Sequence, residues 1–537
     1  MFARFPFALK KFARVRLTAD RAREIVRDRL ANRGANLLQL VERSIYGNPE
    51  SPYLALLKRA GCSLSDFKEL VKQKGVEGAL TDLRAAGVYV TFEEFKGRKP
   101  IVRGSFELPV TTRDFDNPGL RRDFTVQTGG STGLSTLVGQ DLDHIADGAP
   151  LQMLALEAHE LLDVPTAHWM HILPGTAFRF LLQRAHMSQW SEHWFSSMGW
   201  RDAKSWPKYD AATVFMVASA RTAGLPIPFP EIVRLDQAVV IAKWIDKTLK
   251  QHGRCLVAMN VSHATRVCVA AFEAGLDIDG ATFRIGGEPI TPAKAELIKS
   301  AGVRIVAGYG MVEISTVGLG CPASADPGEV HFAKDSLALI TNPHPIAGTD
   351  TVVQAFQLTT LADTVGKLML NVEVDDYGIV ERKSCGCALG EIGLDVHISD
   401  IRSYSKLVGE GVTLVGNEMV HILEHVLPSR FGGSALDYQL CEEEDEARLT
   451  RLSLVISPRV QIQSEQQVID FMHESLRASS PAAGAASAVW KQAGTIQVRR
   501  SEPVWTARGK LMSLHIDRSN DVSQTRRRQV SGWRART

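Results

Sequence analysis

The sequence has no long hydrophobic run, few cysteines and almost no net charge. No stretch approaches the ~18–20 consecutive apolar residues of a transmembrane helix, so we expect no stable membrane insertion. Seven cysteines in 537 residues are too few for a disulfide-rich scaffold, and their odd number favours a reduced, cytoplasmic protein. The formal net charge of +2 gives no electrostatic reason to bind nucleic acid, so we expect none as a partner.

The composition is that of an ordinary globular protein, with 45% hydrophobic and 23% charged residues. Apolar runs predict strands at 212–217, 255–259, 282–285 and 303–307, and helical patterns occupy 144–162, 235–251, 262–274 and 292–301. This alternation predicts an α/β fold built from layered sheets and helices.

The chain also divides into parts of different composition. A helix-rich stretch covers about 17–90, and a change near 370–412 precedes a smaller unit of mixed strands and helices. We therefore expect a large N-terminal domain, 1–400, with a helical extension over about 1–90, and a smaller α+β domain, 401–520. The basic tail, 521–537, is expected to be disordered.

A segment rich in glycine and hydroxyl groups, Thr128–Thr136, reads Thr-Gly-Gly-Ser-Thr-Gly-Leu-Ser-Thr. Its glycines let the backbone approach an anion closely, so that hydroxyl and N–H groups can surround phosphate oxygens. It is not a Walker A loop, because the Gly-Lys-Ser/Thr of that loop is absent. A plain glycine-rich turn is the alternative.

Two further segments, Ile285–Pro289 and Ala307–Glu313, end predicted strands. Glycines there open the carboxyl edge of a sheet, where ligands of α/β proteins bind. Tyr309 can stack on a flat ring, and the carboxylate of Glu313 can hold Mg²⁺ beside phosphates. Each segment can equally be a turn that only ends its strand.

Three single residues complete the pattern. The carboxylate of Asp376 suits a ribose diol, and Arg402 suits a ribose hydroxyl or a phosphate. Lys510, at the end of Thr506-Ala-Arg-Gly-Lys510, can neutralise charge that develops during adenylate formation. Taken singly these residues indicate little, and a solvent-exposed lysine is the commoner case.

In this order the segments resemble the motifs of the adenylate-forming superfamily, which includes acyl-CoA synthetases, adenylation domains and luciferases. The superfamily's phosphate loop, Thr-Ser-Gly-Thr-Thr-Gly-x-Pro-Lys, is similar to Thr128–Thr136, and its Tyr-Gly-x-x-Glu motif matches Tyr309–Glu313. Its Gly-x-Glu-Pro segment, ribose aspartate, hinge-region arginine and catalytic lysine fall on Gly287–Pro289, Asp376, Arg402 and Lys510.

The resemblance implies a role for each matched residue. It implies nucleotide-binding roles for Thr128, Gly129, Gly130, Ser131, Thr132, Gly133, Gly287, Glu288, Pro289, Tyr309, Gly310, Asp376 and Arg402. It implies catalytic roles for Lys510 and for Glu313, the latter through Mg²⁺. It also implies that the small C-terminal domain is mobile and swings between two half-reactions.

Within the superfamily, the sequence is most similar to the phenylacetate-CoA ligases. Thr136 stands where other members have a loop lysine, and Ser51-Pro-Tyr53 followed by Ser63–Phe67 is similar to their N-terminal region. A Cys385-Gly-Cys387 patch precedes the hinge-region arginine. The resemblance covers about residues 50–515.

The implied activity is ATP-dependent activation of a carboxylic acid to an acyl-adenylate, followed by transfer to a thiol, most simply coenzyme A. Departures from the motifs leave alternatives open. Ser135 replaces the loop proline, and Tyr404 or Ser405 replaces the hinge aspartate. The acceptor could therefore be a protein thiol or an amine, or the chain could be a non-catalytic nucleotide-binding homologue. A homodimer also stays open.

The acid pocket implied by the resemblance is formed by segments near 168–180, 215–220 and 257–263. These contain the aromatic and histidine residues His168, Trp169, His171, Phe178, Phe215 and His263. Their aromatic content suits an aryl or medium-sized apolar acid, and ordinary core packing explains any one of them equally well.

Four residues form a candidate zinc set, namely Cys321, His331, Cys385 and Cys387. Three thiolates and one imidazole suit tetrahedral Zn²⁺, although Cys-x-Cys is a tighter spacing than the usual Cys-x₂-Cys. Such a zinc would be structural. Unligated thiols beside a histidine are the alternative.

Overall fold

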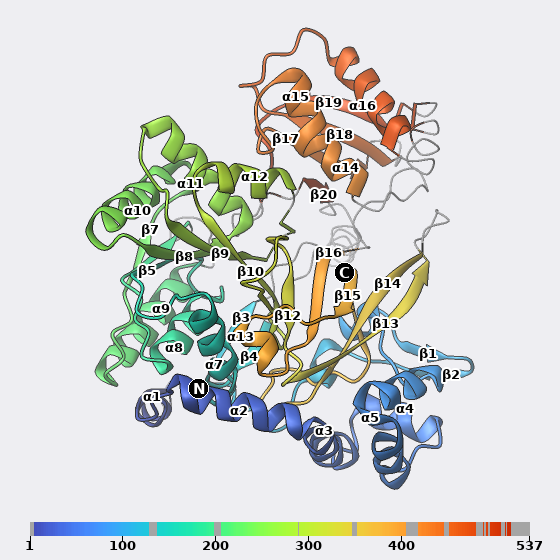
Figure 1. Cartoon of the computed structure of the whole chain (residues 1–537). Helices are drawn as coiled ribbons and strands as arrows, with labels where there is room; N and C mark the ends of the chain where they lie inside the picture. Colours follow the sequence, from blue (N-terminus) through green and yellow to red (C-terminus); the bar gives the residue numbers. More distant parts are fainter. Residues whose placement is uncertain are drawn as a thin grey trace, which may run out of the picture.

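The computed structural model describes residues 5–127, 137–197, 206–287, 289–290, 292–345, 352–403, 417–444, 450–479, 487, 490–491, 494–505, 511 and 513–516 (Figure 1). The expected strand at 212–217 is wrong, because these residues belong to a helix, α9 (Trp206–Thr222). A short apolar run alone does not separate a buried strand from a helix. None of the helices described is both long and apolar enough to cross a membrane.

A single large sheet forms the centre of the molecule, and the α/β prediction is confirmed. Its strand order is β13-β14-β15-β16-β12-β11-β10-β9-β8-β5-β6-β7. The parallel half consists of β5 (Thr166–Trp169), β6 (His193–Ser196), β7 (Pro230–Ile232), β8 (Cys255–Asn260), β9 (Ala281–Gly286) and β10 (Arg304–Met311). The antiparallel half consists of β11 (Ser315–Gly320), β12 (Val330–Phe332), β13 (Leu337–Pro345), β14 (Val352–Thr360), β15 (Val372–Arg382) and β16 (Val396–Ser403).

Helices cover both faces of the parallel half. On one face, Trp169, Met259 and Ile285 pack with α10 (Val239–His252), α11 (Val261–Ala274) and α12 (Pro292–Ser300) in one apolar cluster. The other face is covered by α7 (Leu142–Ala158), α8 (Ala177–His186) and α9. Because side chains alternate along a strand, the neighbours of those three core residues point to this second face.

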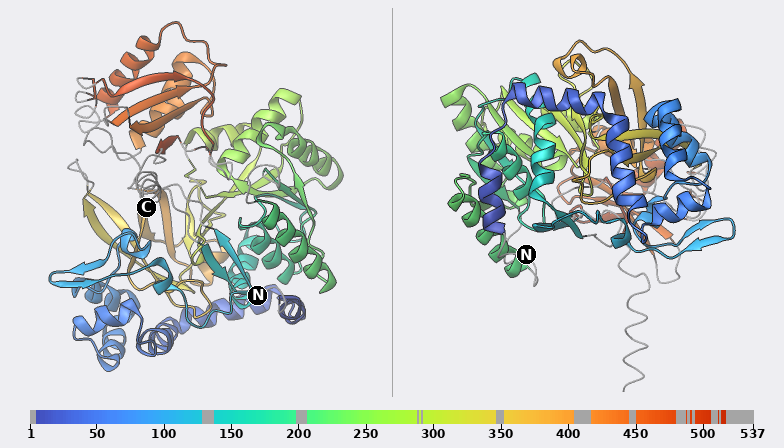
Figure 2. Two further views of the ribbon diagram at one scale, coloured as in Figure 1. Left: turned by 180° about the vertical axis from the view of Figure 1, so that it is seen from behind. Right: turned by 90° about the horizontal axis from the view of Figure 1, so that it is seen from below.

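The N-terminal helices run along one end of the molecule (Figures 1 and 2). They are α1 (Phe5–Ala13), α2 (Ala19–Ala31), α3 (Arg33–Val41), α4 (Pro52–Arg59), α5 (Leu64–Ala85) and the short α6 (Phe92–Phe95). Ser63 and Asp66 form a reciprocal capping box at the start of α5. Two short antiparallel pairs, β1 (Ile101–Arg103) with β2 (Phe106–Leu108) and β3 (Phe124–Gln127) with β4 (Leu137–Gln140), lie outside the large sheet.

A second, smaller sheet with its own core lies at the opposite end (Figure 2). Its order is β19-β18-β17-β20, from β17 (Tyr438–Glu444), β18 (Thr450–Ile456), β19 (Ile496–Arg500) and β20 (Leu514–Ile516). The helices α14 (Asn417–His421), α15 (Leu427–Phe431) and α16 (Glu465–Ser479) accompany it, and α13 (Ala388–Glu391) belongs to the larger part.

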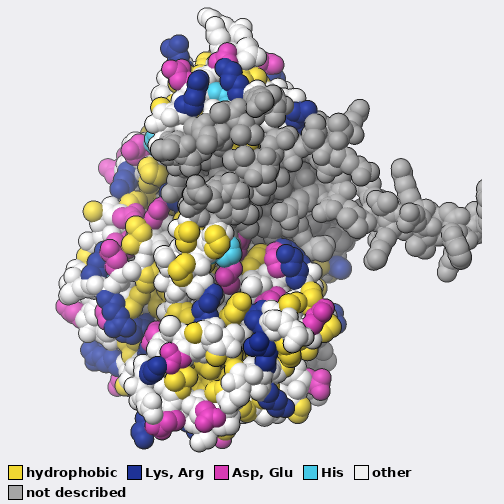
Figure 3. Space-filling model, turned by 90° about the vertical axis from the view of Figure 1, so that its right-hand side faces the viewer, with side chains coloured by type: hydrophobic (Ala, Val, Ile, Leu, Met, Phe, Trp, Pro, Cys, Tyr) yellow, Lys and Arg dark blue, Asp and Glu magenta, His cyan; other side chains and the backbone are white. Residues whose placement is uncertain are grey.

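Two contacts join this smaller unit to the helices of the large sheet. The Nζ of Lys294, on α12, lies 3.5 Å from a carboxylate oxygen of Glu424, and both side chains are buried. The guanidinium carbon of Arg266, on α11, lies 3.2 Å from the centroid of the Trp505 ring. On the face drawn in Figure 3, basic and acidic side chains are interspersed over the described surface.

Asn371 ties α5 to the sheet and generates a stability prediction. It is fully buried with a left-handed φ of 51°, and its Nδ2 donates to the carbonyl oxygens of Leu80, at 2.8 Å, and Val88, at 3.1 Å. Asn371→Ala removes both hydrogen bonds and places a Cβ-bearing residue without a polar side chain in this conformation. We expect the free energy of unfolding to fall by about 2–4 kcal/mol, measured by urea denaturation.

The control is Asn342→Ala, because Asn342 is only half-buried and its described side-chain hydrogen bond is to the adjacent Pro343 carbonyl. Asn371→Gly separates the two causes, since glycine accepts the left-handed φ but still lacks the amide. Equal stability of Asn371→Ala and the control would show that the amide does not tie the two parts together.

Candidate functional site

A cavity of about 210 Å³ lies at the carboxyl ends of β5, β8, β9 and β10. One row of its wall is set by strand register, since His168 pairs with Ala258 and Ala258 pairs with Arg284. Cross-strand partners point to the same face of a sheet, so these side chains lie side by side on the face that α7 and α8 cover. The cavity thus lies between the sheet and these two helices.

Glycines bring two backbone segments close together at the rim of this cavity. A Cβ on Gly286 would lie 2.2 Å from the carbonyl oxygen of Gly308, and a Cβ on Gly310 would lie 2.5 Å from that of Ser315. Gly287 has a left-handed φ of 76°. Residues 285–287 and 308–312, from the two segments that the sequence marks as strand ends, therefore meet at this edge and line the cavity.

Tyr309 and Asp376 meet beside the cavity although their strands are not neighbours. The Tyr309 hydroxyl donates to Oδ2 of Asp376 at 2.8 Å, and the Ser403 hydroxyl donates to Oδ1 at 2.7 Å. Because β16, β12 and β11 separate β15 from β10, the sheet must curve strongly to bring them together. Burial, and then the Asp376 carboxylate, raise the pKa of Tyr309 well above its usual value, so the phenol stays a donor.

Glu313 follows β10 and is buried against a lysine that the motifs do not include. Lys96 Nζ lies 2.6 Å from Oε1 of Glu313, and both side chains are mostly buried. Lys96 directly follows α6, more than 200 residues earlier in the chain. The Glu313 carboxylate is thus held by a cation of the chain itself.

The other predicted nucleotide residues are placed as follows. Gly287 and Gly310 line the cavity, and Pro289 is described beside them. The guanidinium of Arg402 bonds to Asp400 at 2.8 Å, and the structure does not bring it to the Tyr309–Asp376 pair. Outside the described residues lie Thr128, Gly129, Gly130, Ser131, Thr132, Gly133, Glu288 and Lys510.

The expected acid-pocket residues divide between the cavity and the core. His168 and His171 line the cavity. Trp169 and Phe178 are buried in the two apolar clusters, and the His263 ring stacks on Trp169 at 4.3 Å. Phe215 is 40% exposed and lies on the helix α9.

The motifs missed two arginines in the cavity wall. Arg179, on α8, donates to the Ser315 hydroxyl at 2.8 Å, and Arg284 donates to the side-chain oxygen of Gln152. The Phe180 ring lies beside both guanidinium groups, with its centroid 4.7 Å from Arg179 and 6.0 Å from Arg284. Strand alternation could have found Arg284, because it lies two residues before Gly286 and hence on the same face.

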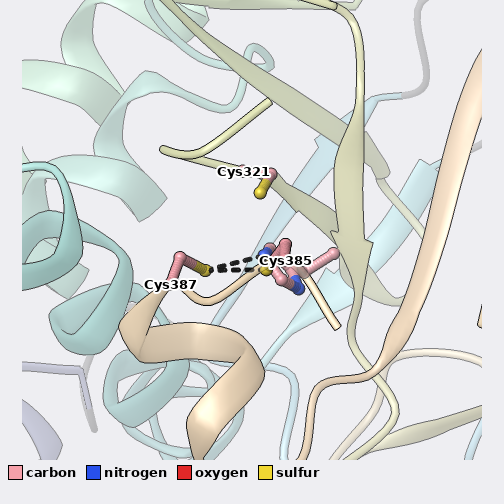
Figure 4. A group of neighbouring side chains, drawn as sticks. Cys321, Cys385 and Cys387 are labelled. Carbon is pink, nitrogen blue, oxygen red and sulfur yellow. Dashed lines mark hydrogen bonds between the residues drawn. The ribbon is translucent and has the colours of Figure 1, made fainter. Parts of the chain in front are cut away.

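The four candidate zinc ligands lie together, although they come from distant parts of the chain (Figure 4). The Sγ atoms of Cys321, Cys385 and Cys387 and a ring nitrogen of His331 lie within 4.8 Å of one another. His331 donates through Nδ1 to the Leu394 carbonyl at 2.7 Å. This fixes the tautomer and leaves Nε2, 3.1 Å from the Cys387 sulfur, as the free lone pair.

The thiols of this cluster are electrostatically unequal. The pKa of Cys387 is lowered, above all by a hydrogen bond from Cys321, whereas the same bond raises the pKa of Cys321. A thiolate is therefore already stabilised at Cys387, which is the protonation state that a metal ligand needs.

No protein-family model and no curated protein sequence matches the chain. Solved structures do match: 2-hydroxyisobutyryl-CoA ligase in the postadenylation state, in complex with 2-HIB-AMP, has a TM-score of 0.52 at 14% identity. The match covers 96% of this chain and 93% of that chain. The same ligase with R3-HIB-AMP gives a TM-score of 0.50 at 14% identity and the same coverage. The chain therefore has the fold of the adenylate-forming ligases, as its motifs predicted.

A histidine beside the cavity generates a pH prediction. His144 Nε2 lies 2.6 Å from the Ser315 hydroxyl, and burial, followed by the charge of Arg179, lowers its pKa from 6.5 to about 4. In the unfolded chain this histidine is protonated below pH 6.5, whereas in the folded chain it stays neutral down to about pH 4. The contribution of His144 to the free energy of unfolding therefore falls by ~3 kcal/mol in total as the pH drops from 6.5 to about 4.

We expect His144→Gln, which keeps an acceptor for Ser315, to flatten the fall in the free energy of unfolding between pH 6.5 and about 4. Urea denaturation at several pH values measures this slope. His252→Gln, at the exposed end of α10, controls for the loss of a histidine. A His144→Gln slope equal to that of the unmodified chain would contradict the assignment.

Proposed function

We propose that the chain activates a carboxylic acid with ATP, forming an acyl-adenylate and pyrophosphate, and then transfers the acyl group to a thiol, most simply that of coenzyme A. The observation that carries this proposal is the Asp376 carboxylate, held by Tyr309 and Ser403 beside a cavity with a glycine-lined rim. The placement suits a nucleoside at the rim and an acid inside. The motif resemblance to phenylacetate-CoA ligases supports the same assignment.

Each group has a proposed role in binding the nucleotide. The Asp376 carboxylate has oxygen lone pairs that suit the two ribose hydroxyls, and the Tyr309 ring suits stacking on adenine. The segments at 286–289 and 308–310 let the backbone approach the nucleotide closely. The loop 128–136 would hold the phosphates by its N–H and hydroxyl groups.

The Glu313 carboxylate is the proposed ligand for magnesium, and its oxygen donors fit this hard cation. Mg²⁺ usually keeps several waters and binds one or two carboxylates together with substrate phosphates, so one carboxylate suffices. Bound there, it would neutralise charge on the phosphates. Lys96, at 2.6 Å, balances the charge of the buried Glu313 and orients its carboxylate.

In the proposed first step, an oxygen of the acid attacks the α-phosphorus of ATP, and the bond from this phosphorus to pyrophosphate breaks. Lys510 is proposed to stabilise the charge that develops. In the second step, a thiol sulfur attacks the acyl carbon, its proton is lost, and AMP leaves. The small unit after residue 400 is proposed to move between the steps. Since Tyr404 or Ser405 replaces the hinge aspartate, a protein thiol or an amine is the alternative acceptor.

The test is acid-dependent release of pyrophosphate from MgATP, with a panel of aryl, fatty and amino acids. We expect release with one class of acid, and its loss by at least about 100-fold in Lys510→Ala, because an aligned charge is removed from the transition state. Lys299→Ala, at an exposed position of α12, is the control. ATP binding without release for any acid would favour a non-catalytic homologue. Thioester formation with coenzyme A separates this acceptor from a protein thiol or an amine.

Asp376→Asn tests the ribose assignment. The charged acceptor is replaced by an amide of the same shape, so we expect the KM for ATP to rise by about 10–100-fold, the value of a charge-assisted hydrogen bond. Steady-state pyrophosphate release measures it. Asp395→Asn is the matched control, because Asp395 pairs with Lys334 away from the cavity. An unchanged KM would remove Asp376 from the nucleotide site.

We further propose that Cys321, His331, Cys385 and Cys387 hold one structural Zn²⁺. The distances, the His331 tautomer and the stabilised Cys387 thiolate support this. We expect elemental analysis to find about one zinc per chain, and Cys387→Ser to lower both the zinc content and the melting temperature. Cys62→Ser, away from the cluster, should retain the metal. A metal-free protein of unchanged stability after chelation would contradict the site.

A further inference from the structure

The cavity wall contains two positive charges. The Arg179 side chain is 6% exposed, and Arg284 projects from β9 into the same cavity. Their described hydrogen-bond partners are uncharged, namely the Ser315 hydroxyl for Arg179 and the Gln152 amide oxygen for Arg284. Each guanidinium has five N–H donors, so these bonds leave most of them available to a ligand.

No carboxylate of the described chain compensates these charges. The residues that line the cavity include no Asp or Glu, and neither arginine forms an ion pair with a described residue. Burial lowers the pKa of both to about 10, and the charge of Arg284 adds to the effect on Arg179. Both nevertheless stay protonated near neutral pH, so the described part of the cavity wall holds two positive charges without a carboxylate partner.

A third group lies in the same row of the sheet. His168 is buried, and neither of its ring nitrogens has a hydrogen-bond partner among the described residues. Burial, followed by the charges of Arg184 and Arg284, lowers its pKa well below 6.5. It is therefore a neutral imidazole with one N–H to donate. Two cations and this donor converge where the described lining offers no carboxylate, and unpaired buried polar groups are costly.

Arg284 lies deeper in the cavity than the proposed nucleotide site at the rim. Along β9, Arg284 precedes the rim residue Gly286 by two positions, so it lies about 6–7 Å further into the sheet. Tyr309 and Gly310 lie at the rim, and Glu313 comes shortly after them in the chain. A ligand that spans the cavity would thus have one end at the rim and the other at Arg284.

We propose that the acid which this site activates carries a second carboxylate, bound by Arg284 and Arg179 with His168 as an additional donor. The inference rests on the proposed function and names its substrate class, a dicarboxylic acid. One carboxylate reacts at the rim, and the other pairs with the arginines, whose planar fork matches a carboxylate. Phe180 packs against the spacer. This replaces the expectation of a purely apolar acid, which rested on aromatic residues that the structure partly places in the core.

The experiment compares each dicarboxylate from malonate to adipate with the monocarboxylate of the same chain length, and terephthalate with benzoate. Acid-dependent pyrophosphate release gives kcat/KM, and titration calorimetry without nucleotide measures binding of the acids alone. We expect kcat/KM for one of the dicarboxylates to exceed that for the matching monocarboxylate by about 100-fold or more. A monocarboxylate would leave the two arginines without an anionic partner. In Arg284→Gln this ratio should fall to near one.

Arg179→Gln provides a second variant, so that misfolding of one does not decide the result, and circular dichroism checks both. The matched control is Arg304→Gln. Arg304 lies on the neighbouring strand outside the cavity, where its guanidinium bonds to the Thr282 hydroxyl and the His159 carbonyl. We expect this control to keep the ratio of the unmodified chain.

The outcomes separate the inference from the proposed function. Release with monocarboxylates as efficient as with dicarboxylates would keep the proposed function and overturn the inference. Dicarboxylate binding that Arg284→Gln abolishes, without pyrophosphate release for any acid, would support the dicarboxylate site and contradict the ligase. An Arg284→Gln effect confined to the KM for ATP, equal for all acids, would assign the arginines to the nucleotide and overturn the inference. Neither binding nor release would contradict both.

Discussion

The close approach of β9 and β10 at their carboxyl ends is the constraint on which the site depends. The backbone of Gly308 passes so near Gly286 that a Cβ there would lie 2.2 Å from a carbonyl oxygen. Any other residue at 286 would push the two strands apart. The same glycines carry no side chain at the rim, so one steric requirement both lets the two strands approach and leaves space at the mouth of the cavity.

The large sheet is also curved in this region. The antiparallel half returns over the carboxyl edge of the parallel half, so that Asp376 on β15 reaches Tyr309 on β10. Lys96, from the segment that links the N-terminal helices to the sheet, pairs with Glu313 at this edge. Three distant parts of the chain therefore supply polar groups to one place. The Asp376 carboxylate and the hydroxyl groups of Tyr309 and Ser403 lie beside the rim, whereas the deeper wall carries two arginines, and this division of charge orients a ligand.

The sequence predicted the parts of this arrangement that depend on local pattern. The strands near 255–259, 282–285 and 303–307 were found because each is a short apolar run, and glycine follows the second and third of them. The run at 212–217 was misassigned, since the helix α9 carries exposed apolar residues, Val214 and Phe215, next to buried ones, and the run is therefore continuous without being a strand. The ordered motifs led to the adenylate-forming fold, although the structures that share it are only 14% identical.

What the sequence could not provide is long-range pairing. Nothing near Lys96 marks it as the partner of Glu313, because their contact spans 217 positions. Arg179 is one of several arginines, and only the position of α8 against the sheet turns it towards Ser315. The cysteine and histidine cluster could be predicted in part. The sequence shows residues of the types that bind zinc, but their convergence depends on the register of β12 and β16 and on the loop before α13.

The most direct test of the account is a crystal structure of the chain with a non-hydrolysable acyl-sulfamoyl adenosine made from glutarate. The account predicts adenine against Tyr309, the ribose hydroxyls on the Asp376 carboxylate, and the free carboxylate of the glutaryl group on Arg284 and Arg179. A nucleoside bound away from Asp376 would contradict the proposed activity. A nucleoside in place with the free carboxylate directed to solvent would contradict the assignment of the cavity to a dicarboxylic acid.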